Sequence, residues 1–444
     1  MTLLKRRFLF FGFVILFFVL IPIVLLYATG HTINWRRLQL EKTATILIDS
    51  EPNNATILFN GRRLPATFLN FFGHTNNLTT NARIKNLAPG EYTVRLEHDG
   101  YWPWEEQILL SPGEAYNFGT VNLYRRSEPA LVMAKNGRIE FSNDKKNVAF
   151  IDKKNLTIIN LADETKNTIT LPKDLAKEAI SWSADHVSIS LGAFLIDSTT
   201  QEIIDLSTKV KSSLTNIQWD ENDNDILYFL SKKKLWRYQK SINALTTIYD
   251  GTNLPITDYL QKNLTWYLIV REANNSESLL SGDNLADLHT IALPAGNYSF
   301  YKSSLQLPLL FDERRAFVLD NPLPLLGQLR LVEIPARFTI GQWLGNTLVY
   351  ATPFELHRFS GENDDVLISR FGDPITALWP LEKKAAILVA TDDSLRLLAQ
   401  GRKPYTLNLA SLSQISGFWV SPDEKTMYAS GSFKNKPGLY RLSL

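Results

Sequence analysis

Aromatic residues recur about every 40 residues through most of this chain, and this repeat constrains the fold more than any other feature. Between them, short apolar runs alternate with turns rich in Asp, Asn, Ser and Lys. Several short strands per unit at this period predict the blades of a β-propeller. The aromatic residue of each unit is expected on its first strand; the eight are Phe141, Trp182, Trp219, Tyr259, Phe300, Trp343, Trp379 and Trp419.

The unit around Trp219 illustrates the expected anatomy of one blade. Residues 216–219 form the inner strand, residues 226–230 a second strand and residues 235–238 a third. Residues 245–249 form the outer edge. Short runs of β-branched and aromatic residues between polar turns are typical of such strands.

Eight aromatic positions predict eight blades, although seven remain possible because the units of Tyr259 and Phe300 are the least regular. The last unit offers only three clear strands. Residues 130–133, read ALVM, precede the first full blade and are expected to supply the fourth. This closure joins the ends of the ring and removes an exposed sheet edge.

Three units share a step from an aromatic residue through a polar turn to an apolar strand. The step reads FSND at residues 141–144, WSAD at 182–185 and WVSPD at 419–423. These units resemble the TolB or WD40-like propeller repeat. The resemblance implies a propeller over residues 127–444, and it implies no particular activity because propellers host many functions.

A different pattern, of period two, precedes the repeat. Strands are expected at residues 45–49, 54–59, 82–85, 92–96, 105–110 and 116–124. Asn60-Gly61, the strongest short signal for a hairpin, closes the second of them. Six or seven short strands in about 80 residues predict a small β-sandwich.

Four motifs in this region carry a family resemblance. SEPNNATI at residues 50–57, NG at 60–61, LAPGEY at 87–92 and DGYWPW at 99–104 together resemble the PEGA domain, from residue 43 to about 126. The resemblance implies a bacterial β-sandwich of surface-layer and envelope proteins, with a spacer or interaction role and no catalysis.

The chain departs from the PEGA pattern at two places. Asn53-Asn54 replaces the usual glycine-containing pair, and residues 66–80 look like an insertion. That insertion carries three phenylalanines and His74 in a polar loop. Such a loop either contacts a partner or packs against the propeller or a membrane surface.

Residues 8–29, read FLFFGFVILFFVLIPIVLLYAT, carry no charge and follow Lys5, Arg6 and Arg7. About 20 apolar residues suffice to cross a bilayer, so this run predicts a transmembrane anchor, with residues 30–42 as a linker. A cleaved signal peptide has a shorter apolar core and a small-x-small site, which LYATG at residues 26–30 does not supply. The positive-inside rule places residues 1–7 in the cytoplasm and the bulk outside.

Composition excludes several classes of protein. A net charge of +2 argues against a nucleic-acid-binding protein. The absence of cysteine excludes disulfides, thiol catalysis and zinc–thiolate sites.

One stretch has the spacing of a calcium-binding loop. Asp220, Asn222 and Asn224 match its first three ligand positions, but Asp225 and Ser231 stand where the loop needs Gly and Glu. An ordinary acidic turn is therefore the favoured interpretation.

Two other groups have catalytic residue types. Ser183, Asp185 and His186 are the types of a triad, but the chain has no G-x-S-x-G motif, so a hairpin turn is favoured. The Asp-Asp pairs at residues 364–365 and 392–393 suggest glycoside chemistry. Adjacent strand residues face opposite sides, however, so solvated turns are favoured.

The remaining polar and aromatic candidates concern binding. None of the six histidines shows zinc-site spacing. Lysines at residues 145–146, 153–154 and 232–234 fall at expected hairpin tips; solvated turns explain them, and binding of an anionic wall polymer or lipid is the alternative. Tyr101, Trp102 and Trp104 either pack in a core or stack on sugar rings.

These patterns predict an all-β, single-pass, extracytoplasmic protein of the bacterial cell envelope, with one amino-terminal transmembrane helix. Its expected role is binding or scaffolding without catalysis, on an envelope protein, peptide or glycan held at the propeller face. No nucleic acid, cofactor, metal or catalytic residue is assigned. The alternatives are an envelope enzyme acting on glycans, such as a lyase or glycosidase, a quinone-dependent dehydrogenase, and a passive surface spacer.

Overall fold

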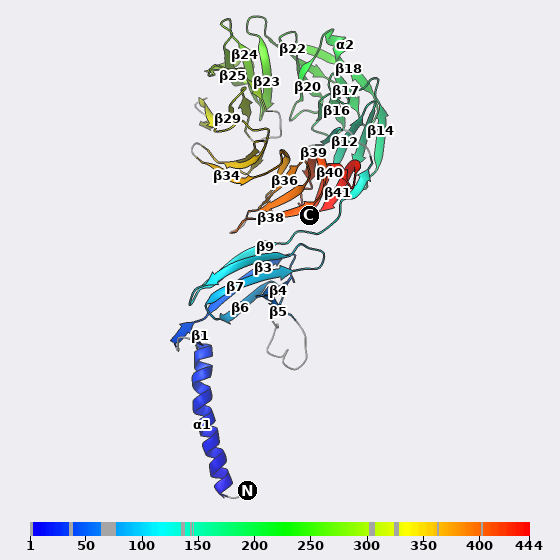
Figure 1. Ribbon diagram of the computed structural model, residues 1–444. Helices are drawn as coiled ribbons and strands as arrows, with labels where there is room; N and C mark the ends of the chain where they lie inside the picture. Colours follow the sequence, from blue (N-terminus) through cyan, green and yellow to red (C-terminus); the bar gives the residue numbers. More distant parts are fainter. Residues whose placement is uncertain are drawn as a thin grey trace. The chain divides into compact units, whose positions relative to one another are not determined.

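The chain forms two compact units, Met1–Ser127 with Leu444, and Glu128–Ser443. A computed structural model describes residues 3–34, 39–63, 77–134, 138–142, 144, 146–301, 307–323, 328–361, 364–400 and 403–444 (Figure 1). The insertion loop with its phenylalanines and His74 lies outside these residues.

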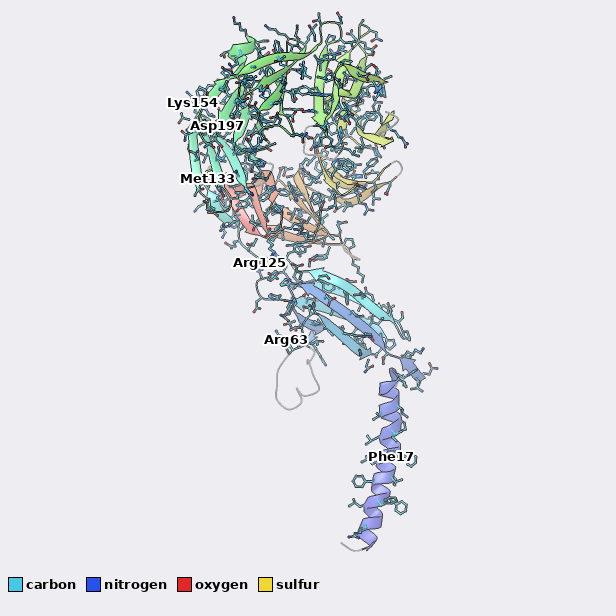
Figure 2. The ribbon with its side chains drawn as sticks, turned by 180° about the vertical axis from the view of Figure 1, so that it is seen from behind. Phe17, Arg63, Arg125, Met133, Lys154 and Asp197 are labelled. Atoms are coloured by element: carbon cyan, nitrogen blue, oxygen red, sulfur yellow. The ribbon has the colours of Figure 1, made fainter. Side chains whose placement is uncertain are left out.

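Helix α1 (Leu3–Ala28) begins the first unit. Its described apolar side chains are exposed at successive positions: Phe8 is 83% exposed, Phe17 58% and Phe18 71% (Figure 2). Within the described residues, no helix is both long and apolar enough to cross a membrane. The span expected over residues 8–29 includes residues 23 and 26–28, whose side chains lie outside the described set.

The described strands of the first unit form a hairpin and two sheets. The hairpin pairs β1 with β2, and the sheets have the orders β6-β3-β9 and β5-β4-β7-β8. Their bounds are β1 (His31–Asn34), β2 (Gln39–Lys42), β3 (Ala44–Glu51), β4 (Thr56–Phe59), β5 (Arg62–Arg63), β6 (Ala82–Leu87), β7 (Gly90–Glu97), β8 (Trp104–Leu110) and β9 (Ala115–Asn122).

Alternating burial along these strands produces the core of the sandwich. On β3, Ala44, Ile46 and Ile48 are buried while the residues between them are more exposed. Asn60 and Gly61 both take positive φ, 49° and 75°, and turn β4 into β5, as the sequence predicts.

The asparagine that departs from the PEGA pattern has a backbone explanation. Asn54 takes a φ of 63°, in the left-handed region that glycine occupies most easily. Asparagine is among the side chains that tolerate this region best. The substitution therefore preserves the turn before Ala55, which is fully buried.

The second unit is a β-propeller. Its described strands form eight four-stranded antiparallel sheets, and these sheets lie around a ring (Figure 1). The inner strands are the first strands of the sheets, β11, β15, β19, β23, β27, β31, β35 and β39. In blade order the bounds are β11 (Arg138–Phe141), β12 (Asn147–Asp152), β13 (Asn155–Asn160), β14 (Lys166–Thr170); β15 (Ile180–Trp182), β16 (Ser188–Leu191), β17 (Phe194–Asp197), β18 (Ile203–Asp205); β19 (Thr215–Trp219), β20 (Ile226–Ser231), β21 (Lys234–Gln239), β22 (Ala244–Asp250); β23 (Ile256–Lys262), β24 (Thr265–Arg271), β25 (Glu277–Asn284), β26 (Asp287–Ala292); β27 (Ser299–Phe300), β28 (Leu309–Phe311), β29 (Ala316–Leu323), β30 (Gln328–Ile334); β31 (Ile340–Leu344), β32 (Thr347–Ala351), β33 (Glu355–Phe359), β34 (Asp365–Arg370); β35 (Ile375–Leu381), β36 (Ala386–Thr391), β37 (Leu395–Ala399), β38 (Tyr405–Ala410); and β39 (Ser413–Val420), β40 (Thr426–Phe433), β41 (Lys436–Ser443), β10 (Ala130–Met133). A short helix, α2 (Leu206–Val210), follows β18.

The eighth blade closes the ring. Strand β10 pairs antiparallel with β41, with Ala130 opposite Arg441 and Leu131 opposite Tyr440. Both predictions, eight blades and the closing role of residues 130–133, are therefore confirmed.

Buried side chains lie between the blades rather than in one central core. Seven clusters among the described residues each join two neighbouring blades. On β12, Val148 packs towards blade 8 and the next residue, Ala149, towards blade 2. Both faces of an inner sheet are therefore covered, which explains the continuous apolar runs in the second strands.

All eight repeating aromatic residues lie on inner strands. Two of them also join neighbouring blades through hydrogen bonds. Trp182 Nε1 donates to the carbonyl oxygen of Glu140 at 3.3 Å, and Trp219 Nε1 donates to that of Ser181 at 3.2 Å. The repeat spacing therefore sets both a packing contact and an inter-blade hydrogen bond at these two positions.

Closure of the ring is testable at Gly438 on β41. A Cβ atom at this position would lie 2.3 Å from the carbonyl oxygen of Met133 on β10. We expect Gly438→Ala to lower the free energy of unfolding by about 1–3 kcal/mol, because β10 must shift. Gly417→Ala in the same blade is the control, since nothing lies within 4 Å of its added Cβ. Equal denaturant midpoints for the two variants would contradict the proposed fit.

Candidate functional site

The triad-type residues of the sequence form a turn. Ser183 Oγ donates to Asp185 Oδ1 at 2.5 Å and accepts from the backbone N–H of Ser188 at 2.9 Å. His186 contacts the preceding blade instead, with its Nε2 3.8 Å from Asp144 Oδ2. Ser183 and Asp185 therefore close a hairpin, as the favoured interpretation has it.

The same turn recurs in two other blades. Ser142 donates to Asp144 at 2.6 Å, and Ser421 donates to Asp423 at 2.5 Å. The hydrogen bond from Ser421, helped by the backbone N–H of Lys425, holds the pKa of Asp423 below its ordinary value. The repeated Ser-x-Asp sequence is thus a device for connecting an inner strand to its neighbour.

The calcium-like stretch is also a turn. Asp220 Oδ1 accepts the backbone N–H groups of Asn222 and Asp223 at 2.8 and 3.0 Å. The other carboxylate oxygen accepts the Tyr228 hydroxyl at 2.9 Å. Burial, followed by the charge of Asp220, raises the pKa of Tyr228 above its ordinary value. Both oxygens of Asp220 are therefore used inside the turn.

The histidines are dispersed over the fold. His31 lies on β1, His98 in a turn of the sandwich, His289 on β26 and His357 on β33. Within the described residues, no group of three or more His, Asp and Glu side chains is arranged to hold a metal ion.

His357 belongs to a polar cluster in blade 6 that sequence reasoning missed. Its Nδ1 lies 3.1 Å from Asp365 Oδ2, and its Nε2 lies 3.3 Å from Glu355 Oε2. A neutral imidazole has one N–H and can donate to one carboxylate, whereas an imidazolium donates to both. Tyr350 stacks on the ring and donates to Asp365 at 2.9 Å, and Arg370 donates to Glu355 at 2.9 Å.

The cluster includes one member of the Asp-Asp pair at residues 364–365. Asp365 holds His357 and Tyr350 together, while Asp364 lies in the preceding turn and donates its backbone N–H to Gly361. The two carboxylates of the pair do not form one described site. Glu355 and His357 stand two residues apart on β33 and therefore lie on the same face of the strand. This spacing is the only sequence signal for their contact.

Arginine side chains lie over the rings of two of the three aromatic candidates. Arg125 Cζ lies 5.6 Å from the centre of the Tyr101 ring, and Arg126 Cζ lies 5.0 Å from that of Trp102. Trp104 is buried and packs edge-on against Phe118. Packing is therefore confirmed for Trp104.

The lysine tips fall on two faces of the propeller. Residues 153–154 and 232–233 connect the second and third strands of blades 1 and 3. Because every blade repeats one meander, turns of the same order lie on the same face of the ring. Lys146 lies in the turn between the first two strands of blade 1 and so belongs to the opposite face. Lys145 lies outside the described residues.

Backbone contacts join the first of these faces into one surface across blades 1 to 3. The N–H of Leu175 donates to the carbonyl of Lys153 at 3.2 Å, and that of Leu206 to Ala193 at 3.0 Å. Lys232 Nζ lies 3.5 Å from the carbonyl oxygen of Val210. We call this surface the lysine face; it comprises residues 152–154, 171–179, 192–193, 205–213, 232–234 and 250–254.

Eight lysines on the lysine face are exposed. Lys173 Nζ lies 5.0 Å from the centre of the Phe194 ring, and Lys209 Nζ lies 5.9 Å from that of Tyr238, so aromatic rings support two of the stems. Lys234, a ninth, is paired with Asp250 at 3.0 Å. The exposed set is Lys153, Lys154, Lys173, Lys177, Lys209, Lys211, Lys232 and Lys233.

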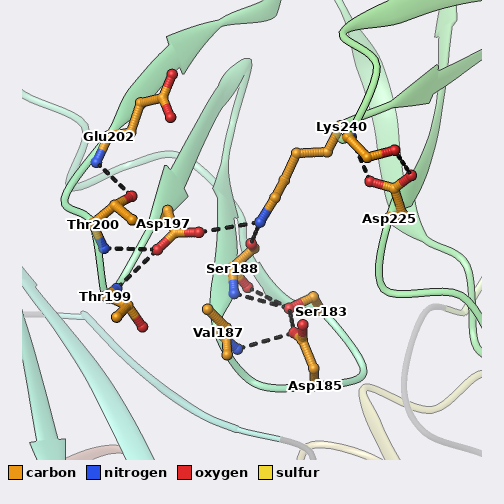
Figure 3. A network of polar contacts seen from close by, with 11 residues as sticks. Ser183, Asp185, Val187, Ser188, Asp197, Thr199, Thr200, Glu202, Asp225 and Lys240 are labelled. Carbon is orange, nitrogen blue, oxygen red and sulfur yellow. Dashed lines mark hydrogen bonds and ion pairs between the residues drawn. The ribbon is translucent and has the colours of Figure 1, made fainter.

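A partly buried network on the opposite face joins blade 2 to blade 3 (Figure 3). Lys240 Nζ donates to Ser188 Oγ at 2.8 Å and to Asp197 Oδ2 at 3.1 Å. Burial acts to raise the pKa of Asp197. The N–H of Thr200, the ammonium of Lys240 and the N–H of Thr199 outweigh it and hold that pKa below its ordinary value.

The network predicts a pH-dependent contribution to stability. Lys240→Met should lower the free energy of unfolding at pH 7 by about 1–2 kcal/mol. Because folding lowers the pKa of Asp197, this difference should be present above about pH 3.9 and shrink as the pH falls below it. Lys234→Met is the control, since its partner Asp250 is 54% exposed and the loss should be smaller. Urea unfolding at pH 7 and pH 3 measures both; equal losses for the two variants would contradict the network's role.

For Glu140, on the inner strand β11, we expect the opposite dependence of stability on pH. Burial raises its pKa to about 7 from an ordinary value of 4.5, while the charge of Arg138 opposes the rise. The folded chain therefore holds this proton more tightly than the unfolded chain, and stability falls as the pH rises from about 4.5 to 7. Glu140→Gln should gain up to about 3 kcal/mol over the parent chain at pH 8 and nothing at pH 4. Glu202→Gln, at an exposed carboxyl group, is the control; a pH-independent gain would reject the assignment.

Residues 43–124 match the family model of the PEGA domain. The match spans β3 to β9, together with the turn of Asn54, and confirms the resemblance seen in the four motifs. It covers the sandwich alone, so the PEGA domain identifies one part of the chain.

No curated protein sequence matches this chain. Solved structures similar to it include the WD40 repeats of RRP9, at 9% identity and a TM-score of 0.43 over 71% of this chain and 97% of that one. Dipeptidyl peptidase 4 of Porphyromonas gingivalis is 8% identical, with a TM-score of 0.49 over 71% of this chain and 58% of that one. A eukaryotic initiation factor is 12% identical, with a TM-score of 0.47 over 70% and 87% of the two chains.

Proposed function

We propose that this chain is a single-pass membrane protein of the bacterial envelope whose propeller binds an envelope ligand without chemical conversion. α1 is its anchor, the PEGA domain is a spacer or interaction module, and the propeller presents its faces outside the cytoplasm. The observation that carries this proposal is the apolar surface of α1.

Exposed side chains on α1 support the anchor. Phe8, Phe10, Phe11 and Phe13 are each at least 62% exposed, and successive helical positions point to different sides. A helix that is apolar on every side is stable in a protein core or in a bilayer. Because its described side chains are exposed, a bilayer is the environment that fits them, and lysine and arginine at residues 5–7 favour a cytoplasmic amino terminus.

Two features support a binding role. The PEGA family match places a small sandwich between the helix and the propeller in the chain. The Ser-x-Asp turns and Asp220 use their catalytic-type or ligand-type groups inside hairpins. The lysine face, in contrast, presents eight exposed cations. Surface charge of this kind suits recognition and carries no bond-breaking chemistry by itself.

Charges placed in the middle of α1 test the anchor. Phe17→Lys with Phe18→Lys should move the full chain from the carbonate-resistant membrane pellet to the soluble fraction, because central lysines disfavour insertion by a few kcal/mol each. Leu264→Lys is the control, since this side chain is 64% exposed in a propeller turn. Protease added to cells with opened outer barriers should degrade the propeller of the parent chain. A soluble parent chain, or a propeller as resistant as a cytosolic protein, would overturn the proposal.

A further inference from the structure

The charges of blades 1 to 3 are separated between the two faces of the ring. On the lysine face, the defined segments hold nine lysines and five carboxylates, a net charge of +4. The described residues of the turns on the opposite face hold two lysines and ten carboxylates, a net charge of −8; they are residues 142, 144, 146–147, 160–165, 183–188, 197–202, 220–226 and 239–243. The whole chain carries only +2, so this separation is local.

The acidic groups of the lysine face are mostly engaged within their own loops. Asp205 caps α2 by accepting the N–H of Ser207 at 2.9 Å, and Asp174 accepts the N–H of Ala176 at 3.1 Å. Asp250 pairs with Lys234. Within the described ion pairs, none of the eight exposed lysines is matched by a carboxylate. Lys232 Nζ donates to the backbone carbonyl oxygen of Val210, a neutral group, so no described ion pair neutralises the charge of these lysines.

The lysines also follow one path. Residues 153–154 of blade 1 contact the loop 171–179, which carries Lys173 and Lys177. A Cβ atom at Gly192 would lie 2.5 Å from Glu178, so that loop also covers the corresponding turn of blade 2. The segment 205–213 then reaches the turn 232–234, whose Lys233 carbonyl oxygen lies 2.1 Å from a Cβ built at Gly251. The cations are thus distributed over three consecutive blades.

We propose that the lysine face binds a linear anionic polymer that carries backbone phosphates and no nucleobases. This proposal rests on the function proposed above and names its ligand. Every cation in the segments is lysine, a mobile point charge that suits a flexible row of phosphates, whereas arginine suits fixed bidentate contacts. Attraction of this kind releases counterions from the polymer and depends steeply on salt.

The described composition of the lysine face favours a polymer over the other anionic partners. Binding to a lipid surface draws on apolar side chains that enter the bilayer. Of the large apolar side chains described on this face, only Leu254 is exposed, at 36%. Single-stranded nucleic acids stack on exposed aromatic rings. The two rings nearest the lysines, Phe194 and Tyr238, are 7% and 0% exposed.

The test uses the full chain in neutral detergent and long-chain inorganic polyphosphate as the probe. The fourfold variant Lys153→Gln, Lys154→Gln, Lys232→Gln and Lys233→Gln removes charge at two exposed turns. We expect binding at least about tenfold weaker, and a plot of log K against log salt whose slope is shallower by roughly three, about 0.7 per lost contact. The control removes four exposed lysines in or beside turns on the opposite face of the propeller, Lys146, Lys166, Lys383 and Lys425, and should bind as the parent chain does.

Thermal unfolding of both variants shows that the ring is intact. Failure of the parent chain to bind polyphosphate, or equal weakening by both variants, overturns the proposal. Tighter lysine-dependent binding to phosphatidylglycerol vesicles assigns the face to a membrane, and tighter binding to DNA assigns it to nucleic acid; each also overturns it. Membrane fractionation of the same variants distinguishes the proposed anchor from the proposed ligand. A parent chain that stays in the membrane but does not bind polyphosphate contradicts the ligand and leaves the anchor standing.

Discussion

The pairing of β10 with β41 is the interaction on which the propeller depends. Each blade is stabilised by the neighbouring blades that cover its two faces, because the described apolar clusters lie between blades. Residues 130–133, which precede blade 1 in the chain, supply the fourth strand of blade 8 and so connect the two ends of the ring. Cluster contacts such as Val148 and Ile159 against Trp419 then bury apolar area at the seam.

In the closed ring, the position of a turn within its blade determines which face of the propeller carries its side chains, since all blades repeat one meander. A lysine between the second and third strands joins one face, and an aspartate between the first and second joins the other. On the face opposite the lysine face, the hydrogen bonds of Lys240 to Asp197 and Ser188 join blades 2 and 3.

Sequence reasoning succeeded where the information was local. The repeat located eight inner strands, ALVM at residues 130–133 located the closing strand, and Asn60-Gly61 located a hairpin. It could not find the cluster of His357, because Asp365 reaches the imidazole only through the pairing of β33 with β34 and a bulge beside Leu356. Nor did it unite the lysine tips, because their common face depends on strand order in blades about 80 residues apart.

The seam imposes an order of events during synthesis. Strand β10 is among the first parts of the propeller to be made, and its partner β41 is among the last, roughly 300 residues later. At translation rates of about 5–20 residues per second, β10 waits about 15–60 s for that partner. A chain that ends before β41 lacks the strand that pairs with β10. The ring can therefore close only after β41 has been synthesised.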